Sequence, residues 1–259
     1  MAISIDFRDR VVIVTGGAGS IGAAIVDRFL DSGASVGVLD RTTPRQDAIG
    51  TSPAEPSRRS IFVATDLGDS GSVDSAVETV AKELGAPSIL VNAAGVLRVG
   101  PLDDHGDQNW LDSMNVNVIG AMRATRSTLP YLRKIDGSNI VNIGSVAAYI
   151  GSADGSPYTA SKGAVISMTY AHAGELSSAG IRVNCVSPGW VEGGFTEIGR
   201  KNAHDPEQFM EYARNLHYLG RVGKPTEIAN AVIWLASPLA SFVTGTNLIV
   251  DGGYSIKHG

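Results

Sequence analysis

Three side chains in the second half of the chain have the chemistry needed for proton transfer. Ser145 offers a hydroxyl, and the run YTASK from Tyr158 to Lys162 offers a phenol and an amine. On a helix, residues four apart lie on one face about one turn from each other, so Tyr158 and Lys162 are expected to share a pocket. A hydroxyl, a phenol and an amine in one pocket could move a proton to or from a bound substrate.

The pairing of Tyr158 with Lys162 has an electrostatic use. A free phenol titrates near ~10 and is a poor base at neutral pH. At roughly 4 Å and an effective dielectric constant of about 20, an ammonium favours the phenolate by about 4 kcal/mol, or about three pKa units. Lys162 is therefore predicted to lower the pKa of Tyr158 toward the range of a general acid and base. An isolated pair of this kind is usually a packed ring beside a solvated charge, so the rest of the chain must supply the context.

Composition and charge narrow the expected partners to small molecules. The chain has 259 residues and a formal net charge of -5, with both signs interspersed. It has no basic stripe for nucleic acid and no polybasic segment for an anionic membrane. No apolar run reaches the roughly eighteen residues of a membrane span. A small-molecule substrate is expected, without nucleic-acid or membrane partners.

The cysteine and histidine content bears on location and on metals. Cys185 is the only cysteine, so the chain has no internal disulfide, which suits a reducing compartment. Residues 1–10 are charged and lack the apolar segment of a secretory signal. A cytoplasmic location is therefore expected. The five histidines lack the spacing of metal ligands, and no catalytic metal is predicted.

Short β-branched segments alternate with helical patterns along the chain. Apolar residues at helical spacing, such as Ile21, Ile25 and Phe29, separate these segments. This alternation predicts a parallel sheet with helices on both faces. We therefore predict a single α/β Rossmann domain over residues 1–259, built on a doubly wound parallel sheet of seven strands. The predicted strands are 11–15, 35–39, 61–64, 89–92, 140–143, 181–186 and 248–250.

Two stretches interrupt this pattern. Residues 41–60 contain Pro44, Pro53 and Pro56, which predict a loop with at most a short helix. Residues 189–215 place bulky apolar side chains among polar ones. This composition and length predict a lid over a pocket.

A glycine-rich turn joins the first predicted strand to the first predicted helix. The glycines of TGGAGSIG match the GxGxxG pattern of a dinucleotide-binding turn. Such glycines allow a close approach of the backbone to a pyrophosphate, which the helix N-terminus also attracts. Glycine-rich turns also arise for packing or bind other nucleotides, so the motif alone does not decide the ligand. The turn residues predicted to bind a cofactor are Gly16, Gly19, Ser20, Ile21 and Gly22.

Asp40 ends the second predicted strand and indicates which dinucleotide would bind. It stands eighteen residues beyond Gly22, near the roughly twenty expected of an acid that binds the ribose 2′-hydroxyl. A carboxylate accepts from this hydroxyl and repels a 2′-phosphate, so NAD is predicted over NADP. Arg41 and Arg45 leave NADP open, because an arginine beside the ribose can bind the phosphate.

With these residues in place, nearly the whole chain resembles the classical short-chain dehydrogenases/reductases. The shared motifs include NAAG at residues 92–95, VNVIG at residues 116–120, PG at residues 188–189 and DGG at residues 251–253. The resemblance implies a Rossmann fold and hydride transfer between a nicotinamide cofactor and a CH–OH group. It implies cofactor contacts from Asp40, Arg41, Asp66, Leu67, Asn92, Ala93, Gly95, Tyr158, Lys162, Pro188, Gly189 and Val191.

By the same resemblance, Asn117, Ser145, Tyr158 and Lys162 would form a catalytic tetrad. Ser145 would hydrogen-bond the reacting oxygen and stabilise charge there, and Tyr158 would exchange the hydroxyl proton. Lys162 would hold the nicotinamide ribose and lower the phenol pKa, while Asn117 would hold a water that relays protons. The hydride chemistry belongs to the cofactor, and the protein supplies placement and electrostatics.

Two positions depart from the family pattern. Gly19 and Ser20 stand in the reverse of the usual order, which should leave phosphate binding intact. Gly193 replaces a threonine that contacts the nicotinamide amide. Val191 keeps the backbone part of that contact, and Thr196 is the candidate for the missing hydroxyl. The glycine could also loosen the lid and weaken cofactor binding.

The substrate pocket is predicted at the reacting end of the cofactor site. Its walls would include Ser145, Ala147, Tyr149 and Trp190, with Val96, Ile150, Phe195 and His217 nearby. Aromatic faces with polar tips suit a sugar, a polyol or a cyclic secondary alcohol. Tyr149 and Trp190 could instead simply pack.

Two alternative functions stay open at this point. A 3-oxoacyl-(acyl-carrier-protein) reductase would use the same reacting residues, but it would fit better with NADP and a basic face for its acidic carrier. An NAD(P)-sensing regulatory protein could keep the fold and the glycine turn without turnover. Such a regulator would need none of Ser145, Tyr158 and Lys162.

The helix that contains Tyr158 predicts self-association. Its residues Val165, Ile166, Met168 and Ala171 are apolar on more than one face. One face would meet the sheet, and the other could meet a second copy of the chain. The resemblance likewise implies a homo-oligomer, a dimer of dimers.

Overall fold

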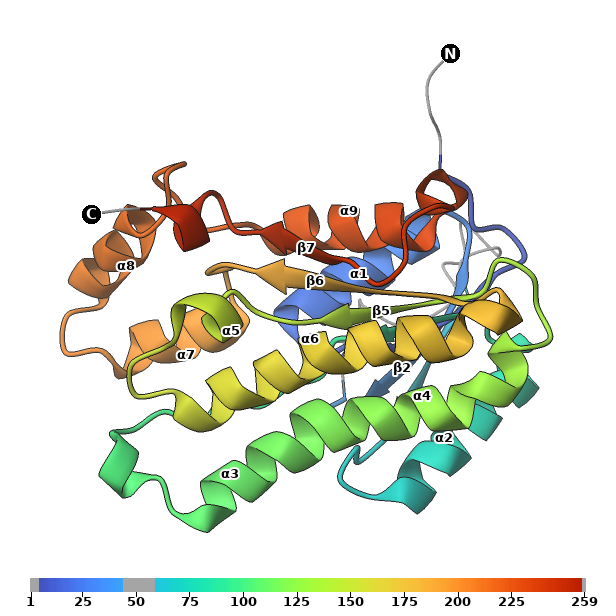
Figure 1. The fold of residues 1–259 in the computed structure, drawn as a ribbon, viewed down its shortest axis with the longest axis horizontal. Coiled ribbons are helices and arrows are strands. Elements are labelled where there is room, and N and C mark those ends of the chain that lie inside the picture. The colour runs from blue at the N-terminus through green and yellow to red at the C-terminus, as the bar shows by residue number, and fades with distance from the viewer. Residues whose placement is uncertain (1–4, 44–58, 258–259) are drawn as a thin grey trace.

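The computed structural model describes residues 5–43 and 59–257, and within these ranges seven strands form one parallel sheet. The strand order is β3-β2-β1-β4-β5-β6-β7, so the chain starts near the centre and winds to one edge and then to the other (Figure 1). The seven-stranded, doubly wound Rossmann architecture predicted from the sequence is confirmed. The strands are β1 (Val11–Thr15), β2 (Ser35–Asp40), β3 (Ser60–Ala64), β4 (Ile89–Asn92), β5 (Asn139–Ile143), β6 (Arg182–Pro188) and β7 (Asn247–Val250).

The observed strands begin and end within two residues of their predicted bounds. Every residue of β1, β4 and β5 is buried, because helices cover the sheet on both sides. Burial on both faces produces the continuous apolar runs seen in the sequence. The largest difference is in β6, which continues to Pro188 because this residue still pairs with Val250 of β7. Most of the loop predicted over residues 41–60, Arg45 included, lies outside the described residues.

Helices cover both faces of the sheet (Figure 1). α1 and α9 pack together on one face, and α2, α4 and α6 cover the other. Among the described residues, no helix is long and apolar enough to cross a membrane. The helices are α1 (Ser20–Asp31), α2 (Ser70–Leu84), α3 (Asp107–Met114), α4 (Ala121–Leu132), α5 (Ala147–Ile150), α6 (Ser156–Leu176), α7 (Gly194–Asn202), α8 (Pro206–Asn215) and α9 (Pro225–Ala236).

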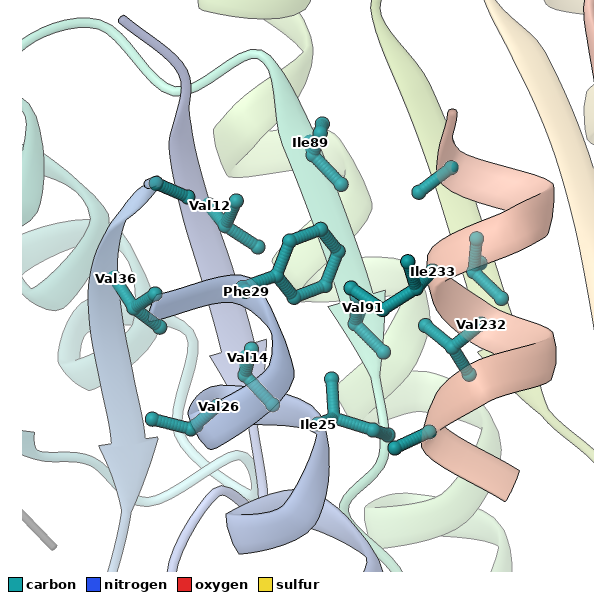
Figure 2. Packing of buried hydrophobic residues seen from close by; sticks show 14 of the residues in the cluster. Val12, Val14, Ile25, Val26, Phe29, Val36, Ile89, Val91, Val232 and Ile233 are labelled. Atoms are coloured by element: carbon teal, nitrogen blue, oxygen red, sulfur yellow. The ribbon is translucent and has the colours of Figure 1, made fainter. Parts of the chain in front are cut away.

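Phe29 anchors α1 to the sheet (Figure 2). Its fully buried ring lies among Val12, Ile89 and Val91 of the central strands, and Val232 of α9 belongs to the same cluster. Truncating a buried phenylalanine to alanine costs about 3–5 kcal/mol. This packing holds α1 firmly, and with it the glycine turn at the N-terminus of the helix.

The carboxyl ends of the strands meet at one edge of the sheet, as they must when all strands are parallel. β1 leads there into the glycine turn, β5 into Ser145 and β6 into Gly189. Helices α5, α7 and α8 gather at the same edge, on the left of Figure 1. The winding direction reverses between β1 and β4, and Rossmann folds bind their ligands at this switch point.

Candidate active site

The glycine turn between β1 and α1 is packed too closely for side chains. Gly16 has φ +69, and a Cβ built there would lie 2.5 Å from Cα of Ala94. A Cβ on Gly22 would lie 2.1 Å from the carbonyl oxygen of Gly16. A Cβ built on Gly19 would meet only the Gly16 carbonyl oxygen, at 3.4 Å. Gly19 lines a cavity next to the turn. A compact turn with an open surface at a helix N-terminus is suited to a pyrophosphate.

Asp40 stands at the end of β2, beside the glycine turn. Its carboxylate accepts one hydrogen bond on each oxygen, from the backbone N–H groups of Ala18 (3.1 Å) and Thr42 (3.0 Å). Each oxygen has further acceptor capacity, so the carboxylate can also accept from a ribose hydroxyl. Arg41 follows directly and lines the same cavity.

One cavity of about 880 Å³ connects the glycine turn with the predicted reacting groups. Small-molecule sites occupy roughly 300–1,000 Å³. Asn92, Asn117 and Tyr149 are the predicted site residues that do not line it. The predicted residues that do are Gly16, Gly19, Ser20, Ile21, Gly22, Asp40, Arg41, Asp66, Leu67, Ala93, Gly95, Ser145, Ala147, Tyr158, Lys162, Pro188, Gly189, Trp190 and Val191.

Tyr158 and Ser145 both line the wall of this cavity, with the serine hydroxyl close enough to affect the pKa of the phenol. The backbone N–H of Ala147 donates to Ser145 Oγ at 3.1 Å, which leaves the serine proton for the phenol oxygen. Burial raises the pKa of Tyr158, and the Ser145 hydroxyl acts in the opposite direction. The phenol therefore holds its proton at neutral pH.

Lys162 is almost fully buried, with 3% of its surface exposed. Its Nζ donates to the carbonyl oxygen of Ile143 at 2.8 Å and lies 5.7 Å from the centroid of the Tyr158 ring. Burial lowers the pKa of Lys162 to about 8. The lowered phenol pKa expected from Lys162 is not found. Burial dominates at Tyr158, and the amine is held by a backbone carbonyl.

The side chain of Asn117 is held by three hydrogen bonds. Asn117 lies in a short π-helix, Asn115–Gly120, between α3 and α4. Its side-chain oxygen accepts from the backbone N–H of Val96 at 2.7 Å. Its amide nitrogen donates to the Val96 carbonyl at 3.0 Å and to Ser161 Oγ at 2.9 Å. The carboxamide thus braces the segment after β4 against α6, and the relay water at Asn117 stays a prediction.

Asn92 also supports the site from outside the cavity. Its side chain is buried and donates to Asn142 Oδ1 at 2.9 Å. Asn142 in turn donates to Thr169 Oγ1 of α6 at 2.9 Å. These bonds tie β4 to β5 and α6, so Asn92 supports the central sheet and does not itself line the cavity.

Tyr149 was predicted to line the substrate pocket and instead points away from it. α5 is one short turn, and its residues Ala147 and Ile150 line the cavity. Residues three apart share a helix face, so Tyr149 is left on another face. Its hydroxyl accepts a hydrogen bond from the side chain of Asn247 at the start of β7. His217, predicted near the substrate, does not line the cavity either.

A group of aromatic side chains, here called the aromatic wall, lines the cavity beyond Tyr158. The rings of Trp190 and Phe209 lie 5.4 Å apart, and those of Tyr158 and Phe195 lie 6.0 Å apart. Phe209 and Tyr212 come from α8 within the predicted lid. Their spacing of three residues indicates a shared helix face, so the sequence could have predicted them. Tyr254 comes from the C-terminal segment, which gave no such signal. The wall consists of Trp190, Phe195, Phe209, Tyr212 and Tyr254.

Asp154 is a further cavity residue that sequence reasoning missed. It lies on the loop between α5 and α6, with φ +59. Its carbonyl accepts from the backbone N–H of Gly100 at 2.8 Å. Its left-handed conformation and its place in the cavity depend on the folded loop, so the local sequence carries no signal for them. An acidic residue in this part of the lining, away from the glycine turn in the chain, favours neutral or cationic substrates over anionic ones.

The segment after β6 offers a hydrogen-bond donor to the cavity. The Trp190 carbonyl accepts from the N–H of Gly223 at 2.8 Å, and the N–H of Glu192 donates to the Gly223 carbonyl at 2.9 Å. Between them, the N–H of Val191 has no hydrogen bond among the described residues, and Val191 lines the cavity. A carboxamide oxygen could accept from this N–H. Thr196 also lines the cavity. The site therefore fits a nicotinamide dinucleotide at its phosphates, ribose and carboxamide.

Known proteins are similar to this chain over almost its whole length. A family model described as enoyl-(acyl carrier protein) reductase matches residues 16–255. L-fucose dehydrogenase of Bos taurus is 35% identical over 260 residues, which cover 100% of this chain and 94% of the relative. D-threitol dehydrogenase of Mycolicibacterium smegmatis is 33% identical over 259 residues, covering 99% and 98%. The solved structure of Thermoplasma acidophilum aldohexose dehydrogenase has a TM-score of 0.87 at 34% identity, covering 97% of this chain and 96% of that one.

The fold, the site and these matches define a nicotinamide-dependent oxidoreductase of the Rossmann class. The chain belongs to the short-chain dehydrogenase/reductase family. It is an enzyme that acts on a CH–OH group, and members of this family use NAD or NADP.

Proposed function

We propose that this enzyme is an NAD-dependent dehydrogenase that interconverts a secondary alcohol and its ketone, with Tyr158 as general acid and base. The observation that carries the proposal is that Ser145, Tyr158 and buried Lys162 line one cavity together with the glycine turn and Asp40, with Lys162 Nζ 5.7 Å from the centroid of the Tyr158 ring. A protein that only senses a dinucleotide would need the turn and Asp40. It would have no use for the three reacting side chains.

The preference for NAD rests on Asp40. Two backbone N–H groups hold its carboxylate, so the charge cannot turn away from the ribose without losing both hydrogen bonds. A 2′-phosphate would bring a second negative charge against it, which is unfavourable at close range. Arg41 is the side chain that could offset this repulsion, so NADP is the weaker alternative.

In the oxidation direction, Tyr158 takes the substrate hydroxyl proton while Ser145 donates a hydrogen bond to the same oxygen. Bound NAD supplies the hydride acceptor. Lys162 has donor capacity left beyond its bond to Ile143 and would hold the nicotinamide ribose. Because burial raises the pKa of Tyr158, oxidation should quicken as pH rises toward that pKa, whereas reduction uses the phenol already present at neutral pH.

The aromatic wall and Asp154 point to a neutral, hydroxyl-bearing substrate. The C–H faces of a ring or polyol chain can pack on aromatic side chains, while hydroxyl groups can donate to a carboxylate. An anionic substrate would face the charge of Asp154. The names of three similar proteins, an L-fucose, a D-threitol and an aldohexose dehydrogenase, suggest sugars and polyols as the first candidates.

The test is a substrate screen with purified protein. NAD and NADP are each offered with L-fucose, D-threitol, aldohexoses and cyclic alcohols, and with the matching ketones in the reverse direction, while nicotinamide absorbance is followed. NAD-linked turnover of a neutral sugar, polyol or cyclic alcohol is expected. Activity with NADP alone would contradict the role given to Asp40.

The family model's description favours one second candidate, a reductase of acyl-carrier-protein substrates. Such an enzyme would use the same Ser145, Tyr158 and Lys162. It would need to admit a long phosphopantetheine arm and to dock an acidic carrier, which fits poorly with Asp154 and a net charge of -5. NADPH-dependent reduction of an acetoacetyl thioester, faster than any alcohol oxidation, would establish this second candidate.

We further propose that residues 1–259 form one catalytic domain in which residues 189–215 act as a lid. In support, this stretch holds α7 and α8 and supplies Trp190, Phe195 and Phe209 to the aromatic wall. A homo-oligomer, a dimer of dimers, and a cytoplasmic location remain predictions for this enzyme. Limited proteolysis with and without NADH tests the lid, because closure should protect the bonds within it.

A further inference from the structure

His217 is a buried histidine that the proposed reaction does not use. It lies just after α8, and 2% of its surface is exposed. Nδ1 lies 2.8 Å from the carbonyl oxygen of Ala213, one turn earlier. A carbonyl oxygen can only accept, so Nδ1 carries the ring hydrogen. Nε2 therefore has a free lone pair, and it accepts from the backbone N–H of Trp190 at 3.3 Å.

The His217 ring joins three parts of the chain. A Cβ built on Gly189 would lie 3.0 Å from Nε2 and 3.0 Å from Cα of Asp251, so a larger residue there would press on the imidazole and on the C-terminal segment. On another side, the ring centroid lies 5.2 Å from that of Tyr254 in the C-terminal segment. The end of α8, the segment after β6 and the C-terminal segment thus meet at one side chain.

Hydrogen bonds hold the segment from Gly189 to Glu192 on both sides. The N–H of Gly189 donates to the Val250 carbonyl at 3.1 Å, and two bonds join Trp190 and Glu192 to Gly223. The fourth bond is the one from Trp190 to His217. Of these four, only the bond to His217 uses a side chain. A substitution can therefore remove it without changing the backbone.

The orientation of the Trp190 peptide affects two parts of the cavity. The Trp190 indole lies beside the Tyr254 hydroxyl, and its ring packs on Phe209 in the aromatic wall. The next residue, Val191, presents its N–H where a nicotinamide carboxamide is expected. A rotation of this peptide would move both the substrate wall and the cofactor donor.

We propose that His217 is a positioning residue of this enzyme. By accepting the Trp190 N–H, it fixes the indole on the substrate side of the cavity and the Val191 N–H on the cofactor side. The inference rests on the proposed function, because it assigns Val191 to the nicotinamide and Trp190 to the alcohol. Neither contact involves His217 itself, which acts through the segment after β6.

Two amide variants separate this role from ordinary packing. His217→Gln places an oxygen near the position of Nε2, where it can accept from Trp190, but it loses the donor to Ala213. His217→Asn keeps a donor for Ala213 but is too short to reach Trp190. Each variant removes the ring and leaves one buried backbone group unpaired, so both should lose similar stability. Their unfolding temperatures provide the matched control.

The two variants should differ in binding. His217→Gln is expected to keep NADH affinity and the alcohol KM within about threefold of the unsubstituted enzyme. His217→Asn should weaken both by about tenfold, as the loss of one hydrogen bond would. NADH affinity is measured by fluorescence titration, and KM with the best substrate from the screen described above.

Equal losses in the two variants, in step with their unfolding temperatures, would reduce His217 to a packing residue and overturn the inference. The NADH titration needs no substrate, so it tests His217 whichever alcohol the enzyme oxidises. If the unsubstituted enzyme binds NADH but turns over no alcohol or ketone, the proposed function fails. The NADH affinities of His217→Gln and His217→Asn then still test the role of His217.

Discussion

The reacting side chains are held by backbone groups. The N–H of Ala147 orients Ser145, and the carbonyl of Ile143 holds Lys162. Such bonds fix geometry at a buried site, but burial also favours the neutral forms of both titrating groups. The pKa of Tyr158 is raised, and that of Lys162 is lowered to about 8. The ligand-free site therefore stores the proton on the phenol.

Replacing Tyr158 with phenylalanine tests the phenol directly. The ring would keep its edge contact with Phe195, so the cavity should stay intact. Loss of a general acid and base costs roughly 10²–10⁴-fold in turnover. We expect a loss of this size in kcat, with NADH affinity within about threefold because the ring's packing is kept. Tyr170→Phe is the matched control on α6, since Tyr170 does not line the cavity. Unchanged turnover in Tyr158→Phe would refute its role.

Burial of Lys162 predicts how stability depends on pH. Its pKa is about 8 in the folded protein, against 10.5 for an unperturbed lysine. Between these values the unfolded chain holds a proton that the folded protein has released, so the free energy of unfolding rises with pH. At neutral pH both states are charged, and the buried ammonium destabilises the fold by about 3 kcal/mol. The free energy of unfolding that the buried Lys162 ammonium removes at pH 7 should be regained as the pH rises from about 8 toward 10.5.

Lys162→Met should remove this dependence. Other groups that titrate in the same range are shared by both proteins and largely cancel in the difference. Urea unfolding from about pH 7.5 to about pH 10 should show the unsubstituted protein gaining up to about 3 kcal/mol relative to the variant. Parallel curves for the two proteins would mean that folding does not lower the pKa of Lys162.

At the scale of elements, the start of α1 touches the start of the lid. Gly193 and Gly194 have φ +77 and +47, and Cβ atoms built on them would lie 2.9 Å from Ser20 Cβ and Ser20 Oγ. Ser20 and Gly193 are the two positions that depart from the family pattern. Their contact gives a physical reason for finding them together, because the serine side chain occupies space that a larger residue at 193 would need.

Gly193→Ala should weaken cofactor binding through this contact. The added methyl would press Ser20 away from the expected pyrophosphate, and we expect the NADH dissociation constant to rise by about tenfold, or about 1.4 kcal/mol. Gly180→Ala is the control for positive φ alone, because a Cβ there meets nothing within 4 Å. In a Ser20→Gly background, Gly193→Ala should cost less. If the two substitutions change the free energy of NADH binding additively in this double-mutant cycle, Ser20 and residue 193 do not interact.

The elements could be read from the sequence because their causes are local. Strands buried on both faces give continuous apolar runs, and a glycine turn between strand and helix is itself a sequence pattern. Side-chain directions have causes outside the local segment. The π-helix around Asn117 and the single turn of α5 rotated Asn117 and Tyr149 away from the cavity. Neither rotation could be inferred from residue type or spacing.

At the scale of the whole molecule, the cavity combines segments that are distant in the chain. Asp154 enters it in a left-handed conformation, and Tyr254 reaches it from the C-terminal segment. Their position depends on how the loops pack after the sheet has formed, so no sequence motif marks them. The residues proposed to recognise substrate were therefore harder to predict than those proposed to bind the cofactor, whose motifs follow strand ends directly.

Large apolar side chains are exposed near the β7 edge of the sheet. Phe242 is fully exposed, and Trp234, Leu239 and Ile249, which lie within eight residues of it in the chain, are also exposed. An open strand edge with such a surface is suited to a second copy of the chain, since burying one phenylalanine contributes about 1.5–3 kcal/mol. A homotetramer is predicted to use this surface for one of its two kinds of interface.

Phe242→Asp should divide that tetramer into dimers without unfolding it, because the side chain packs against nothing in the isolated chain. Sedimentation velocity at micromolar concentration measures the change. Leu102→Asp is the control, since Leu102 is also exposed but lies elsewhere, just after β4 and before α3. The control should remain tetrameric, and both variants should stay folded, as circular dichroism can show. A monomeric unsubstituted protein at micromolar concentration would contradict the predicted assembly altogether.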